Sequence, residues 1–181
     1  MNSRMVVAVD VDEVCADLLG EWLRRYNARY SDNLTSADIA GWDFSQQLKP
    51  DARGGPFYDI LREPDMYNHI QPLPGALAAI SSIKDAGHRV VYVSSCVEGT
   101  ADAKQDWLRR HGFLDSSHDF IAASDKSLIR ADCLLDDRPL NVDRFLGEAF
   151  LIAHPHNRHY GGERLRVTLT EAASIIRSVV P

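Results

Sequence analysis

Short apolar runs alternate with helical patterns along almost the whole chain, and this alternation constrains the fold more than any other feature. The clearest run, residues 5–9, is uninterrupted and rich in β-branched residues, as expected of a strand buried on both faces. Similar runs predict four further strands, at residues 89–93, 120–123, 133–135 and 149–153. Strands separated by helices favour the α/β class, in which helices cover both faces of a parallel sheet.

Apolar residues recur with a helical period between these runs. In residues 14–30 they fall on one face, and further helices are predicted at residues 76–86, 100–111, 139–146 and 170–179. Either Thr168 or Thr170 is expected to cap the last of them, because a hydroxyl can bond the free N–H groups of the first turn.

About forty residues between the first predicted helix and Pro74 carry no strand pattern. They contain several aromatic residues with glycine and proline between them, and they are too many for an ordinary strand-to-helix loop. We therefore expect a small helical cap inserted after the first strand. The predicted boundaries are residues 1–14 and 74–181 for the catalytic core and residues 15–73 for the cap.

Net charge, apolar runs and cysteine content disfavour several classes of function. Among 181 residues, Lys+Arg 20 against Asp+Glu 26 gives a net charge of −6, which disfavours binding to a nucleic acid polymer. The apolar runs are too short to span a membrane. Cys15, Cys96 and Cys133 are an odd number at wide spacing, which predicts reduced, buried thiols and a cytoplasmic protein.

Polar residues follow several of the predicted strands. Because ligands of open parallel sheets bind beyond the carboxyl ends of the strands, we expect these side chains to meet at one edge. They are Asp10 and Asp12 after the first strand, Ser94 and Ser95 after the second, and Asp136 and Asp137 after the fourth, with Lys126 between the third and fourth.

This set of residue types suits phosphoryl chemistry. Asp10 and Asp136 can share Mg²⁺, which prefers carboxylates, waters and phosphate oxygens. A carboxylate can then attack phosphorus and form an aspartyl-phosphate, and Asp12 can act as acid and then as base. Ser94 and Lys126 supply a hydroxyl and a positive charge for the phosphoryl oxygens. Each part alone is common in turns and caps, so the prediction rests on the whole set in this order.

The chain resembles the haloacid dehalogenase (HAD) superfamily at these motifs. DVDEV after the first strand resembles its first motif, VVYVSS its second, Asp125-Lys126 its third and LLDDRP its fourth. Residues 37–44, 72–76 and 152–157 further resemble the 5′(3′)-deoxyribonucleotidase family. The resemblance implies an α/β fold with a HAD-like Rossmannoid three-layer core, a parallel sheet and a small helical cap.

The resemblance also implies roles for the acidic residues. Asp10 would be the nucleophile and a Mg²⁺ ligand. Asp12 would be the general acid/base and would bind Mg²⁺ through its backbone carbonyl. Asp136 would be the other metal ligand, and Asp137 would orient a water molecule on the metal.

The remaining motif residues would contact the substrate. Ser94, Ser95 and Lys126 would bind its phosphate. Trp42 and Phe44 would form a wall of the substrate pocket on which a base stacks, or they would pack in the core of the cap; the sequence leaves both readings open.

The implied function is a Mg²⁺-dependent phosphomonoesterase of the 5′-nucleotidase type. It would dephosphorylate nucleoside monophosphates, with deoxyribonucleotides favoured, through an aspartyl-phosphate. One alternative is another small phosphate ester, such as a sugar phosphate or a biosynthetic intermediate, because substrate choice lies in the cap. A second is a non-catalytic phospho-receiver module, although receivers carry their acidic pair first and not last. The oligomeric state stays open, a homodimer included.

Two further features have no fixed role. His154, His156 and His159 form an H-x-H-x-x-H pattern, which we expect on a loop at the rim of the active site; a transition-metal site is the alternative. Arg138 is expected to form a salt bridge, with a contact to the substrate phosphate or the cap as the alternative.

Overall fold

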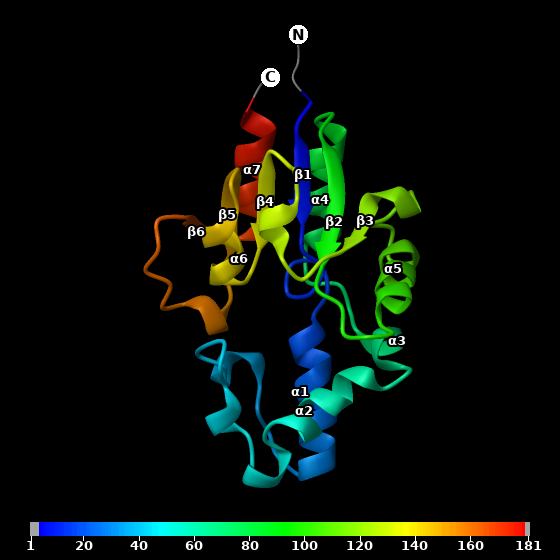
Figure 1. Ribbon diagram of the computed structural model, residues 1–181, viewed down its shortest axis with the longest axis vertical. Helices are drawn as coiled ribbons and strands as arrows, with labels where there is room; N and C mark the ends of the chain where they lie inside the picture. Colours follow the sequence, from blue (N-terminus) through cyan, green and yellow to red (C-terminus); the bar gives the residue numbers. More distant parts are fainter. Residues whose placement is uncertain (1–3, 180–181) are drawn as a thin grey trace.

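Six parallel strands form one sheet, in the order β3-β2-β1-β4-β5-β6, in the computed structural model, which describes residues 4–179 (Figure 1). Every neighbouring pair is parallel, which confirms the predicted α/β class. The outer ends of the predicted core, residues 1–3 and 180–181, lie outside the described residues. The strands are β1 (Val6–Val9), β2 (Arg89–Ser94), β3 (Phe120–Ala122), β4 (Cys133–Asp136), β5 (Glu148–Ile152) and β6 (Leu165–Val167).

Strand β6 was not predicted, so the expected number of five strands is wrong. It pairs with β5 at the edge of the sheet, with Leu151 opposite Arg166. Leu165 and Arg166 are exposed. A three-residue edge strand with a central arginine lacks the apolar run that marks the buried strands.

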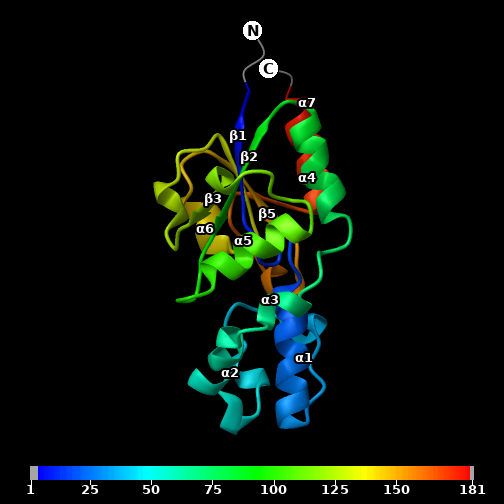
Figure 2. The same ribbon diagram turned by 90° about the vertical axis from the view of Figure 1, so that its right-hand side faces the viewer.

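Helices cover both faces of the sheet. Alternate strand residues point to opposite faces: Val7 and Val9 pack with α4, α5 and α7, whereas Ala8 packs with α6. Figure 2 shows α4 and α7 together on one side of the sheet and α6 on the other. The three layers are those expected of the core. The helices are α4 (Ala76–Asp85), α5 (Ala101–Arg110), α6 (Pro139–Arg144) and α7 (Leu169–Ser178).

The start of α7 answers the question that the sequence left open. The hydroxyl of Thr168 accepts a hydrogen bond from the Glu171 N–H at 3.2 Å, and the Glu171 carboxylate accepts one from the Thr168 N–H at 2.8 Å. Thr168 is therefore the cap, in a reciprocal capping box. Within residues 4–179, no helix is both long and apolar enough to cross a membrane.

A second, helical body lies beyond the carboxyl ends of the strands, at the opposite end of the molecule from the start of β1 and the end of α7 (Figures 1 and 2). It contains α1 (Leu18–Tyr30), α2 (Gly55–Asp59), α3 (Met66–His69) and short 3₁₀ turns. Trp22 of α1 stacks on Phe57 of α2 with ring centroids 4.0 Å apart. The expected helical insertion after the first strand is therefore present, and the boundaries at residues 15 and 73 remain a prediction.

Tyr26 of α1 forms two hydrogen bonds to the segment that follows the helix. Its buried hydroxyl donates to Asp32 Oδ2 at 2.6 Å and accepts from the Lys49 N–H at 2.9 Å. We expect Tyr26→Phe to lower the free energy of unfolding by about 1–2 kcal/mol, because the Lys49 N–H loses its partner. Urea unfolding measures this. Tyr58→Phe is the control, since Tyr58 is 54% exposed, and equal losses in both variants would contradict the prediction.

Candidate active site

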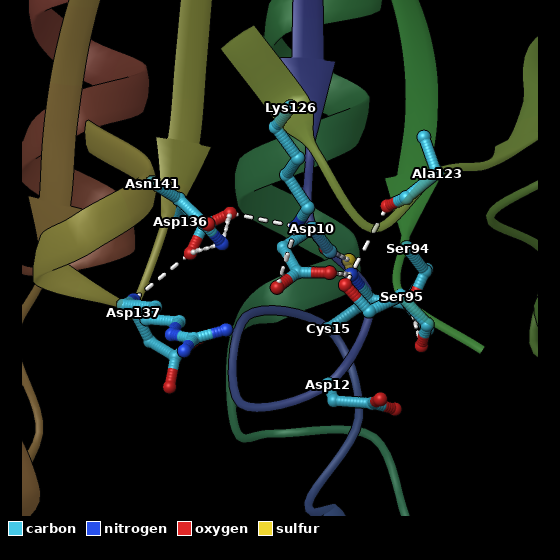
Figure 3. Close-up of polar contacts among 12 residues, drawn as sticks. Asp10, Asp12, Cys15, Ser94, Ser95, Ala123, Lys126, Asp136, Asp137 and Asn141 are labelled. Carbon is cyan, nitrogen blue, oxygen red and sulfur yellow. Dashed lines mark hydrogen bonds and ion pairs between the residues drawn. The ribbon is translucent and has the colours of Figure 1, made fainter. Parts of the chain in front are cut away.

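The strand order reverses beside β1. The chain adds β2 and β3 on one side of β1 and then β4, β5 and β6 on the other, so the loops after β1 and β4 diverge and leave a crevice. Asp10 follows β1 directly, and Ser94 and Asp136 are the last residues of β2 and β4. Figure 3 shows Asp10 between Asp136 on one side and Ser94 and Ser95 on the other. The predicted edge of the sheet therefore does bring these residues together.

Lys126 links two of the carboxylates. Its ammonium lies 2.8 Å from Asp10 Oδ2 and 2.6 Å from Asp136 Oδ2, and its side chain has no exposed surface. Burial opposes the charge of this ammonium, but Asp10 and Asp136 outweigh that effect and raise the pKa of Lys126. Lys126 is therefore a fixed positive charge inside the site.

A third carboxylate, Asp137, lies near the two that contact this ammonium. Asp10, Asp136 and Asp137 each offer an oxygen within 4.8 Å of the others, and all three are buried. Burial, then the neighbouring Asp10 carboxylate, raises the pKa of Asp136 to about 6, and burial with Asp136 and Asp10 raises the pKa of Asp137 well above its usual value. The excess of buried negative charge favours a second cation, and an all-oxygen donor set suits Mg²⁺.

Asp12 has partners that differ from those of Asp10. Its Oδ2 lies 2.5 Å from the ammonium of Lys104, and its Oδ1 accepts a hydrogen bond from the Tyr67 hydroxyl at 3.2 Å. Lys104 also donates to Ser94 Oγ at 2.9 Å and to the Ser95 carbonyl at 2.5 Å. Asp12 is thus held by one residue of the core helix α5 and one of α3.

Lys104, which is only 2% exposed, was not among the predicted site residues. A lysine in a helix is usually a solvent-exposed residue. A signal was present nevertheless, since Lys104 lies three and four residues before the buried Trp107 and Leu108 and therefore shares their helix face.

The two predicted serines differ in exposure. Ser94 is buried, and Ser95 is exposed. Ser95 Oγ donates a long hydrogen bond of 3.5 Å to the Ala123 carbonyl, and a closer acceptor on a ligand can replace it. Both serines lie at the same edge as Asp10, as predicted.

A cavity opens between this polar edge and the helical body. Its floor includes Asp10, Asp12 and Asp137, and its far wall is apolar. The wall residues that come from the helical body include Leu18, Trp22, Ile39, Trp42, Phe44 and Tyr58.

Trp42 is 52% exposed and lines the cavity, so it does not belong to the core of the cap. Phe44 is half-buried and contacts both the cavity and the rings of Trp22 and Phe57. The Arg138 guanidinium lies over the Trp42 ring, 4.9 Å from its centroid. Within the described residues Arg138 has no carboxylate at salt-bridge distance, so the salt bridge expected for it is wrong and its contact with the cap is present.

The three histidines do not converge. His156 is buried with Nε2 2.8 Å from Asp137 Oδ2, and His154 lies beside Glu13, whereas His159 is exposed. Burial, reinforced by the neighbouring His156, lowers the pKa of His154 to about 4, and burial with Arg166 does the same for His156. His156 lines the cavity, which agrees with the expected position at the rim of the site.

Solved structures of low sequence identity share the fold. A HAD family hydrolase from Deinococcus radiodurans, solved with bound phosphate and sodium, aligns with a TM-score of 0.59 at 15% identity over 99% of both chains. The HAD-type hydrolase YfnB from Bacillus subtilis, solved with magnesium, aligns with a TM-score of 0.60 at 14% identity over 96% of this chain and 98% of that one. The likeness shows that this chain has the fold of these hydrolases, a parallel sheet with an insertion after β1.

Sequence comparison is more specific. The family model for 5′ nucleotidase, deoxy (pyrimidine), cytosolic type C protein matches residues 4–180. A 5′(3′)-deoxyribonucleotidase from Clostridium acetobutylicum is 31% identical over 156 residues, 86% of each chain, and one from Bacillus subtilis is 26% identical over 159 residues, 86% of this chain and 89% of its own. The chain belongs to the cytosolic type C 5′-nucleotidase family, which confirms the resemblance, and it is an enzyme that hydrolyses phosphoric monoesters.

Proposed function

We propose that the chain is a Mg²⁺-dependent 5′-nucleotidase that hydrolyses deoxyribonucleoside monophosphates through an aspartyl-phosphate on Asp10. The observation that carries the proposal is the position of the Asp10 carboxylate, beside the buried Lys126 and beneath a cavity whose opposite wall is apolar and aromatic. Relatives named 5′(3′)-deoxyribonucleotidase support the choice of substrate.

Asp10 and Asp136 are the proposed protein ligands of Mg²⁺, together with the backbone carbonyl of Asp12, and Asp137 would orient a water molecule on the ion. The excess of buried carboxylates over ammonium groups fits a divalent cation. When bound, Mg²⁺ would neutralise that charge and polarise the phosphoryl group. The Asp136 carboxylate is held in place for metal binding, because its Oδ1 accepts hydrogen bonds from the Arg138 N–H at 2.9 Å and from Asn141 Nδ2 at 3.1 Å.

The chain's own residues would carry the bond changes. Asp10 would attack phosphorus as the ester bond to the leaving oxygen breaks, and Asp12 would give that oxygen a proton. Asp12 would then take a proton from the water that hydrolyses the aspartyl-phosphate. Lys104 and Tyr67 hold the Asp12 carboxyl by contacts of 2.5 and 3.2 Å, which fixes the position of the proton donor.

Donors converge where the phosphate would lie. We propose that Ser94, Ser95 and Lys126 bind its oxygens, and Lys104 joins them because its ammonium contacts Ser94 Oγ. Such groups stabilise the charge that the phosphoryl oxygens carry during transfer.

The cap, proposed as residues 15–73, would select the leaving group. Trp42 and Phe44 face the cavity opposite the acidic edge, and a base stacked on them would keep the nucleotide phosphate at Asp10. A cytoplasmic location is part of the proposal, and the free thiols Cys15, Cys96 and Cys133 support it. Cys15 and Cys133 are buried as expected, whereas Cys96 is only partly buried, so the expectation of three buried thiols is wrong for Cys96.

Phosphate release tests the proposed function. The purified protein would be assayed with Mg²⁺ on deoxyribonucleoside and ribonucleoside monophosphates, sugar phosphates and p-nitrophenyl phosphate. The proposal requires the highest kcat/KM on a deoxyribonucleoside monophosphate. A preference for sugar phosphates would contradict the substrate and keep the chemistry, whereas a long-lived phosphoprotein without turnover would mean a phospho-receiver.

Replacing Trp42 by Ala is expected to raise the KM for the preferred nucleotide about 10- to 100-fold, because stacking of one base on an aromatic ring contributes about 1–3 kcal/mol. The kcat/KM for p-nitrophenyl phosphate should change much less, since this ester has no base. Steady-state kinetics on both substrates measures the difference. A parallel loss on both would mean that Trp42 serves the fold of the cap.

A further inference from the structure

Glu13, His154 and His156 form a second group of metal-ligating side chains, which we call the His–Glu cluster. Each offers one ligand atom within 4.8 Å of the ligand atoms of the other two. Glu13 and His156 line the cavity. His156 contacts Asp137, which is the link between the cluster and the acidic edge. Neither the proposed hydrolysis nor the packing of the core uses the cluster as a unit.

One distance inside the cluster is close to that between two ligands of one metal ion. His154 Nδ1 lies 3.8 Å from Glu13 Oε2, which is too far for a hydrogen bond between them. Two ligand atoms of a tetrahedral zinc ion, each about 2.0–2.1 Å from the metal, are separated by roughly 3.3 Å. The two atoms would therefore need to approach by only a fraction of an ångström to share one ion.

Two of the three ligands are already oriented by other contacts. Glu13 Oε1 accepts a hydrogen bond from the Leu19 N–H at 2.7 Å, which leaves Oε2 facing His154. His156 Nε2 lies 2.8 Å from Asp137 Oδ2, and a proton on Nε2 leaves the lone pair on Nδ1. Hydrogen bonds of this kind, from a carboxylate to the second nitrogen of a histidine, orient the ring in metal sites.

The backbone conformation and the burial of Glu13 are a second indication that its side chain has a function. Glu13 has φ of 56°, a left-handed conformation that is rare outside glycine, asparagine and aspartate, and its side chain is only 11% exposed. A residue with a Cβ is strained there, and such strain persists mainly where function needs the side chain. Here the conformation directs a carboxylate toward two imidazoles.

We propose that Glu13, His154 and His156 bind a divalent transition metal ion, Zn²⁺ above all, at a site separate from the acidic edge of the sheet. Two imidazole nitrogens and one carboxylate form a donor set that suits zinc and its neighbours in the first transition row and does not suit Mg²⁺. The cavity gives the ion a path to the site, and three protein ligands leave a coordination position for water or a ligand in that cavity.

This second ion would lie close to the proposed catalytic centre. Asp137 connects the two sites, because it belongs to the acidic group with Asp10 and Asp136 and also contacts His156. The ring of His156 packs edge-on against Trp42 with centroids 5.7 Å apart, so the ion would also fix one side of the Trp42 wall. The site stands on the geometry of its three ligands and does not depend on the proposed substrate.

Binding of Zn²⁺ and of the spectroscopic probe Co²⁺ tests the site. The full chain would be titrated with each ion by calorimetry and by visible absorption of Co²⁺, in excess Mg²⁺ to fill the all-oxygen site that we propose for Mg²⁺. We expect saturable binding of about one ion per chain and a Co²⁺ spectrum with nitrogen ligands. The Asp10→Asn protein should bind the ion equally well, because Asp10 belongs to the other site.

Variants of the cluster complete the test. His154→Ala and Glu13→Gln should each weaken binding by at least about 100-fold, since loss even of a supporting contact in metal sites costs 10- to 100-fold. His159→Ala, at an exposed histidine three residues after His156, should leave the affinity unchanged. Circular dichroism checks that each variant is folded. No saturable binding in Mg²⁺, or binding that survives His154→Ala, would overturn the proposal.

Discussion

Asp10→Asn is expected to lower kcat by about 10⁴-fold or more while the protein stays folded. Asparagine has nearly the same shape, and its side-chain oxygen can still accept the hydrogen bond that Asp10 Oδ1 receives from the Val11 N–H at 2.7 Å. An amide cannot attack phosphorus, however, so the covalent route is lost. A 10⁴-fold loss corresponds to about 5.5 kcal/mol of transition-state stabilisation, which is typical of removing a nucleophile.

Steady-state kinetics and a matched control define this experiment. Asp106→Asn removes an exposed carboxylate of α5 and should leave kcat unchanged. Acid quenching during turnover of p-nitrophenyl phosphate, followed by mass spectrometry, adds a direct readout. Asp12→Asn should accumulate phosphoprotein. The leaving group of p-nitrophenyl phosphate needs no proton, so the phosphoprotein still forms, whereas the attack of water on it needs Asp12 as the base. Asp10→Asn should form none, and substantial turnover by that variant would refute the nucleophile assignment.

The core of this enzyme and its acidic edge follow from sequence because both depend on local pattern. Buried strands such as β1 and β4 must be apolar throughout, and the residues that follow them must lie at one edge of a parallel sheet. Asp10 and Asp136 were therefore predictable without any contact being known. The exposed edge strand β6 was not predicted, because its residues do not form the apolar run of a buried strand.

Residues that reach the site from elsewhere in the fold were harder to find. Lys104 contacts Asp12 across 92 residues, and Tyr67 contacts it across 55. Glu13 is adjacent to Asp12 in sequence, but its contact with His154 depends on a left-handed backbone that no periodicity indicates. Such partners depend on how elements that are distant in sequence pack against one another, which is set along the whole chain.

Lys126→Met is the second variant with a large expected effect, because it removes the one ammonium between Asp10 and Asp136 in the described residues. In EDTA the three buried carboxylates would face one another without that charge, and the free energy of unfolding should fall by about 3–5 kcal/mol. In Mg²⁺ the loss should be smaller, since an ion bound to the folded state restores part of the positive charge. Urea unfolding under both conditions measures the two values.

The stability loss of Lys126→Met should depend on pH, and the sign of this dependence follows from the pKa of Asp136. Burial and Asp10 raise its pKa to about 6, above an ordinary value of about 3.9, so the metal-free protein loses stability as the pH rises between these values. Lys126 opposes that rise in pKa, and its removal widens the window upward. The stability difference between wild type and Lys126→Met should therefore be small near pH 4 and largest above pH 7. Arg62→Met is the control, because the side chains of Arg62 and its ion-pair partner Asp59 are 57% and 65% exposed and the pair should contribute at most about 1 kcal/mol. A loss for Lys126→Met that is independent of both Mg²⁺ and pH would mean that Lys126 supports packing and not the charge balance of the site.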